Sequence, residues 1–80
     1  MIRLQVVKYY AGNDIYFENR DPENRYPNKG HWTITQRGLC LNREGEFEYE
    51  PMPSNRDNDF LARCRFSFDE AKDIYIKYLY

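Results

Sequence analysis

The sequence has few cysteines, almost no net charge and no long apolar run, and each absence argues against a class of protein. Two cysteines in 80 residues are too few for the disulfide framework of a small secreted domain. Twelve Lys and Arg against thirteen Asp and Glu match neither a strongly basic nucleic-acid binder nor an acidic mimic of DNA. No run approaches the ~18 apolar residues of a membrane-spanning helix, and the first residues lack the apolar core of a signal peptide. We expect one cytosolic domain, residues 1–80, with reduced thiols.

Aromatic residues are abundant instead. Phe, Trp and Tyr make up 18% of the chain, and eight of these residues are Tyr. Each large aromatic side chain buries roughly 150–250 Å², which lets a short chain bury enough area for a single core. We expect Trp32, the only tryptophan, to belong to that core.

Alternation of apolar and polar residues predicts an antiparallel sheet of four to five strands. The first 18 residues suggest a hairpin with its turn at 11–14. Residues 31–50 suggest a three-stranded meander with turns at 37–38 and 42–45, ended by prolines. Trp32, Ile34 and Gln36 are expected on one face of this meander.

Helices are predicted after the sheet. Ser67 and Glu70 have the spacing of a capping box. Apolar residues then recur on one helical stripe, namely Ala71, Ile74, Tyr75, Tyr78 and Leu79. Residues 54–66 fit a short helix that Ser54 would cap, although they also alternate as in a strand; we favour the helix. The expected fold is therefore α+β, a small antiparallel sheet with the C-terminal helix packed on one face.

One face of a predicted strand is acidic. Glu46, Glu48 and Glu50 alternate with Phe47 and Tyr49, so a strand would point the carboxylates to one side and the rings to the core. An ordinary strand with one solvated face has this pattern, and this is the interpretation that we favour.

A binding role for the acidic face is the alternative. Residues 44–59 contain six acids and one base, and a field of this sign would attract a basic partner. The candidate partner-binding residues are Glu46, Glu48, Glu50, Arg56 and Asp57. The arginines nearby, Arg56, Arg63 and Arg65, also suit an ion-pair network with Asp57 and Asp59 inside the domain, which we favour for them.

A second candidate surface lies in the polar segment 19–30, which we expect to be a long loop. Tyr and Arg side chains can stack on single-stranded bases. The candidate nucleic-acid-binding residues are Arg20, Arg25, Tyr26 and Lys29. Asp21 and Glu23 lie among them and lower the positive charge, so we rank this surface below the acidic one.

Catalysis and metal binding have little support in the sequence. Cys40, Cys64 and His31 lack the close spacing of a zinc site, and buried free cysteines commonly pack as small hydrophobic residues. No nucleophile, base and orienting group can be assembled from the sequence. We expect a protein without enzymatic activity, metal or cofactor.

The run LNxxGEFEYEPMPSxRD, residues 41–57, resembles a segment of small uncharacterised bacteriophage and prophage proteins. The similar stretch, residues 38–67, covers about a third of the chain. The resemblance implies a phage accessory protein in the bacterial host cytoplasm. Such proteins commonly bind and inhibit a host or anti-phage defence complex, including CRISPR machinery. The resemblance transfers no catalytic residue. A nucleic-acid-binding module and a self-associating structural phage protein are the alternatives.

Overall fold

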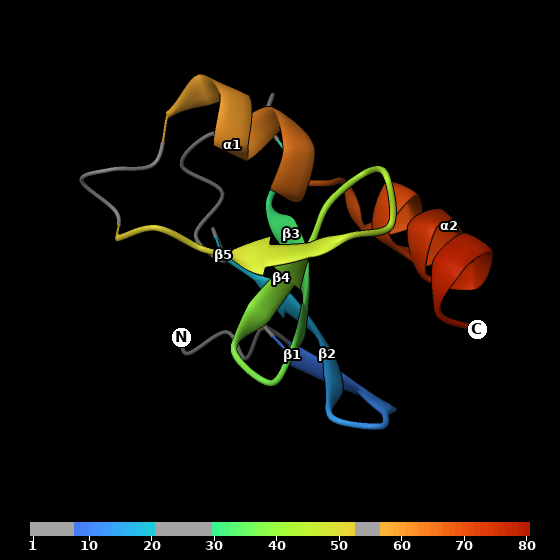
Figure 1. Cartoon of the computed structure of the whole chain (residues 1–80). Helices are drawn as coiled ribbons and strands as arrows, with labels where there is room; N and C mark the ends of the chain where they lie inside the picture. Colours follow the sequence, from blue (N-terminus) through green and yellow to red (C-terminus); the bar gives the residue numbers. More distant parts are fainter. Residues whose placement is uncertain (1–7, 21–29, 53–56) are drawn as a thin grey trace, which may run out of the picture.

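The computed structural model describes residues 8–20, 30–52 and 57–80. Five strands in these ranges form one antiparallel sheet whose spatial order follows the chain, and two helices come after it (Figure 1). The elements are β1 (Lys8–Gly12), β2 (Ile15–Asn19), β3 (Trp32–Gln36), β4 (Leu39–Leu41), β5 (Phe47–Tyr49), α1 (Asn58–Cys64) and α2 (Phe68–Tyr78). The predicted α+β class, the antiparallel sheet of four to five strands and the meander over 31–50 are confirmed.

Strand register places the main core on the α2 side of the sheet. Phe17 lies opposite Ile34, and Leu41 lies opposite Phe47, so these side chains point to the same face. The buried residues of this core are Ile15, Phe17, Ile34, Leu41, Phe66 and Ala71. Most of the predicted apolar stripe of α2 covers them, because Ala71 is buried and Ile74, Tyr75 and Leu79 pack against the same cluster. Tyr78, predicted in the same stripe, is exposed. Trp32 also packs against the cluster while remaining partly exposed.

Part of the opposite face of the sheet, at β4, is covered by α1, which the sequence did not indicate. Cys40 precedes Leu41 in β4 and so points the other way. It forms a second buried cluster with Phe60 and Cys64 of α1. Thr33, on the same side of β3, is also buried.

Both helix starts are capped by side chains. The Ser67 hydroxyl accepts from the Glu70 N–H at 3.1 Å, and the Glu70 carboxylate accepts from the Ser67 N–H at 3.0 Å, so the capping box is confirmed. The helix predicted within 54–66 is also confirmed, but its cap is Asp57, which accepts from the Phe60 N–H at 2.8 Å. Ser54 lies outside the described residues. In the described part of the chain, neither helix has the length and apolar character needed to cross a membrane.

The first hairpin differs from its prediction at the turn. Ala11 and Gly12 belong to β1, and the turn consists of Asn13 and Asp14, both in the left-handed region with φ of 54° and 62°. A turn of two left-handed residues has a backbone twist that matches the right-handed twist of the flanking strands. Asn and Asp tolerate the left-handed conformation better than most residues. Residues 1–7, predicted to begin this hairpin, lie outside the described part.

The segment between the helices is joined to β3. The Trp32 N–H donates to the Phe66 carbonyl and the Phe66 N–H donates to the Trp32 carbonyl, each at 2.8 Å. Gly30 lies directly against this pair, because a Cβ added there would lie 2.7 Å from the Phe66 backbone. A residue without a side chain is thus required at the start of the described segment that leads into β3.

Candidate functional site

Glu48 and Glu50, on the acidic side of β5, lie beneath α1 and form ion pairs with three arginines. Glu48 accepts from Arg63 at 2.8 Å and 3.2 Å, a two-point contact of the kind that guanidinium and carboxylate geometry favours. The Asn42 amide donates to the same carboxylate at 3.0 Å. Glu48 is thus held from both sides by residues of its own chain.

Glu50 and Arg65 form the second ion pair, which is almost completely buried. Their side chains are 13% and 7% exposed. Arg65 also donates to the Cys64 carbonyl at 3.2 Å and lies over the Phe60 ring at 5.7 Å. Arg20 adds a second cation to Glu50 at 3.0 Å. Removing two charges from water costs free energy, so each buried charge depends on its partner. Loss of either partner would leave the other charge buried without compensation.

These contacts correct two predictions. Glu48 and Glu50 do not lie on a solvated face, because α1 brings Arg63 and Arg65 over them, whereas Glu46 is exposed. The arginines do form an ion-pair network, but for Arg63 and Arg65 it is directed to β5 rather than to Asp57 and Asp59. Arg56 lies outside the described residues.

The Arg63 contact lowers the pKa of Glu48 from its ordinary 4.5 to about 2, with the Asn42 hydrogen bond as the next cause. In the unfolded chain this carboxylate takes up its proton near its ordinary pKa. Between about pH 5 and pH 2 the unfolded state therefore binds more protons than the folded state, and the free energy of unfolding falls as the pH falls.

We expect Glu48→Gln to flatten this fall of the free energy of unfolding with pH, measured by urea titrations recorded at several pH values. Glu46→Gln, which removes an exposed carboxylate from the same strand side, serves as the control; an equal flattening there would contradict the assignment.

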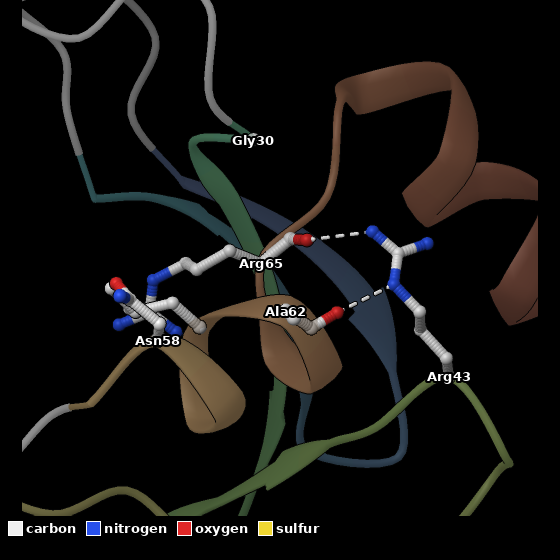
Figure 2. Close-up of a pocket in the computed structure, with 6 residues that line it drawn as sticks. Gly30, Arg43, Asn58, Ala62 and Arg65 are labelled. Atoms are coloured by element: carbon white, nitrogen blue, oxygen red, sulfur yellow. Dashed lines mark hydrogen bonds between the residues drawn. The ribbon is translucent and has the colours of Figure 1, made fainter.

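Arg43 joins the end of α1 to the start of α2. Its guanidinium donates to the Ala62 carbonyl at 2.6 Å, to the Arg65 carbonyl at 3.1 Å and to the Glu70 carboxylate at 2.7 Å. Figure 2 shows Arg43 reaching these two carbonyls from one side while the Arg65 side chain extends toward Asn58. The Ser67 N–H, and after it Arg43, lowers the pKa of Glu70. A cation at the C-terminal end of a helix is favourable, but no sequence pattern linked residue 43 to that end.

The hollow beside Arg43 is lined by charged groups that are already paired within the chain. It has a volume of about 260 Å³ and is lined by Gly30, Arg43, Asn58, Leu61, Ala62 and Arg65 (Figure 2). The guanidinium groups in its wall already donate to backbone carbonyls and carboxylates. It therefore offers a ligand little charge that is not already paired.

The two cysteines are free and buried, as predicted. The Cys40 thiol donates to the Glu48 carbonyl at 3.3 Å. A hydrogen bond from the Cys64 thiol lowers the pKa of Cys40, whereas the same contact, with burial, raises the pKa of Cys64. Within the ranges 8–20, 30–52 and 57–80, no three His, Cys, Asp or Glu side chains gather in a way that would hold a metal ion.

Of the candidate nucleic-acid residues, only Arg20 lies in the described part of the chain. Its guanidinium is 3.4 Å from the Glu18 carboxylate and 3.0 Å from that of Glu50. These two acids neutralise its charge locally. Arg25, Tyr26 and Lys29 lie outside the described residues, so their proposed patch stays a prediction.

The outer edge of β5 is the exposed part of the acidic region. β5 is the last strand of the described sheet. Tyr49, predicted to be buried, is 83% exposed, because the α2 cluster reaches Phe47 but not the end of the strand. Met52, just beyond, is also exposed, as are Glu44 and Glu46. The sequence predicted an acidic surface here but missed its exposed aromatic and thioether side chains.

No protein-family model, curated protein or solved structure matches this chain. The resemblance of residues 38–67 to phage proteins therefore stays a prediction.

Proposed function

We propose that the chain is a small phage accessory protein without enzymatic activity, which binds and inhibits a host or anti-phage defence complex in the bacterial cytoplasm. The observation that carries the proposal is the exposed segment around β5, in which Tyr49 and Met52 are exposed as well as Glu44 and Glu46. Tyr and Met are enriched in protein interfaces, and Tyr is a frequent hot-spot residue.

The chemistry of this edge favours a basic partner segment. Glu44 and Glu46, which precede Tyr49 in the chain, are exposed, and Asp57 and Asp59 are exposed at the start of α1. An edge strand can add an extended segment of another protein through main-chain hydrogen bonds. Glu48 and Glu50 contribute less, because arginines of the same chain already pair with them.

Site-specific crosslinking tests the proposal. A photoreactive phenylalanine analogue replaces Tyr49, and the tagged protein is irradiated in lysate of the bacterial host, with and without nuclease. We expect one nuclease-resistant crosslinked host protein, identified by mass spectrometry. Purified, that protein or its complex should lose its activity when the unmodified chain is added.

The matched control places the same analogue at Tyr10, an exposed tyrosine of β1 at the other end of the sheet. It should give no such product, and Tyr49→Ala combined with Glu46→Lys should abolish capture by the unmodified tag. Equal products from both positions would contradict the assigned surface. Capture lost on nuclease treatment would favour the nucleic-acid alternative instead.

A further inference from the structure

The fold brings the two cysteines of the chain together, although they lie 24 residues apart in the sequence. Cys40 is the middle residue of β4 and is 1% exposed, and Cys64 is the last residue of α1 and is 0% exposed. Both belong to one buried cluster with Phe60, and a hydrogen bond joins their thiols. The contact between β4 and the end of α1 therefore includes two free sulfur atoms side by side.

The local backbone allows these two sulfur atoms to approach further. A disulfide needs them about 2.05 Å apart, closer than two thiols in hydrogen-bond contact. β4 is fixed within the sheet, since it pairs with β3 on one side and with β5 on the other. Cys64 ends its helix, and Arg65 after it has extended backbone. The remaining movement thus falls on the end of α1, where it disturbs no strand pairing.

Access of an oxidant to this pair depends on α1, because both sulfur atoms are buried while α1 is in place. A helix of seven residues has little stability of its own, and elements with few buried apolar contacts open locally. Each opening of α1 exposes both thiols to small molecules in water. A bond between the two sulfur atoms would prevent further opening, since it removes chain entropy from the open state.

We propose that Cys40 and Cys64 are a redox pair, which hydrogen peroxide oxidises to an intramolecular disulfide that fixes α1 on the sheet. One sulfur attacks a peroxide oxygen, the O–O bond breaks, and water leaves with the proton of that thiol, which gives a sulfenic acid. The second sulfur then attacks the first, the S–O bond breaks, and another water leaves with the second thiol proton. The two thiols lose two electrons in total, and the peroxide gains them. This pair goes beyond the proposed function and does not depend on it.

Intact-mass spectrometry of the full chain tests whether the bond forms. The reduced protein is treated with a small excess of hydrogen peroxide, and the remaining thiols are then alkylated in urea. We expect a monomer about 2 Da lighter than the reduced chain and without alkylation, and peptide mapping should find Cys40 joined to Cys64. Dithiothreitol should restore two thiols that can be alkylated. Persisting free thiols, sulfinic acids on both cysteines or a disulfide between two chains would each overturn the proposal.

Hydrogen exchange tests what the bond does to α1. The amides of α1 should exchange about tenfold or more slowly in the oxidised chain than in the reduced chain, and dithiothreitol should reverse the change. The amides of β1 and β2, which are distant from the pair in the strand order, should keep their rates. A disulfide that leaves the exchange of α1 unchanged would overturn the role assigned to it.

Cys40→Ala and Cys64→Ala are the matched controls, since neither variant can form the bond. Peroxide should leave the exchange of α1 unchanged in both. Slower exchange in either variant would mean that oxidation of another residue, such as the exposed Met52, affects α1, and it would overturn the assignment to this pair. If a variant fails to fold, the comparison of the unaltered chain before and after dithiothreitol still decides the result.

Discussion

Replacing Arg65 by alanine is expected to lower the free energy of unfolding by about 3 kcal/mol. Arg65 is 7% exposed and pairs with Glu50, which is 13% exposed, so the substitution leaves a buried carboxylate without its closest cation. Breaking a buried pair in this way costs roughly 3–5 kcal/mol. Arg20 remains 3.0 Å from Glu50, which places the expected loss at the lower end. The measurement is the urea midpoint at constant m-value.

The double variant Arg65→Met with Glu50→Met separates the value of the pair from the cost of an orphaned charge. Replacing both charges by apolar side chains is often neutral or stabilising. We therefore expect the double variant to be more stable than Arg65→Ala. If it were the less stable of the two, the pair itself would contribute net stability, contrary to this account.

Gly30→Ala is expected to lower the free energy of unfolding by about 2–3 kcal/mol. The added Cβ would lie 2.7 Å from the backbone nitrogen and carbon of Phe66, and backbone cannot rotate away as a side chain can. The paired hydrogen bonds between Trp32 and Phe66 would have to lengthen or shift, and forced packing of this kind costs roughly 1–3 kcal/mol. Thermal and urea unfolding of the purified variant measure the loss.

Gly38→Ala is the matched control. Gly38 has φ of 85° but no atom within 4 Å of an added Cβ, so alanine there meets backbone strain without a clash, at a cost of about 1 kcal/mol. Gly30→Ala should therefore be the more destabilising substitution. Equal losses would show that the Phe66 contact is not tight.

Elements that are determined by residues close together in the sequence could be predicted. The capping box at Ser67 and the helical stripe of α2 are local patterns, and so are the alternating strands of the meander. All were confirmed, except that Tyr78 of the stripe is exposed. The cap of α1 was misassigned because both Ser54 and Asp57 are suitable cap residues, and the choice between them depends on where the helix begins.

The candidate site was less predictable because it is made by tertiary packing. Fifteen residues separate Glu48 from Arg63, and Glu50 from Arg65. No local spacing reveals such pairs. The sequence suggested that Arg63 pairs with Asp57 or Asp59, but Arg63 is directed to Glu48 of β5 because α1 packs on that face. Tyr49 was assigned to the core from alternation alone. Alternation indicates the face to which a side chain points, but it does not show how far along β5 the α2 cluster extends, and that cluster reaches Phe47 but not Tyr49.

The order of strands along the chain has a consequence for how the protein is made. Each strand pairs with the one synthesised just before it, so the sheet can assemble through short-range contacts, a topology associated with fast folding. The two helices that pack on its faces are synthesised after the sheet. Until Arg63 and Arg65 have been synthesised, Glu48 and Glu50 are charges on an uncovered strand, where they oppose pairing with other nascent chains. Glu48 and Glu50, which later pair with Arg63 and Arg65, thus also oppose aggregation of the sheet before the helices have been synthesised.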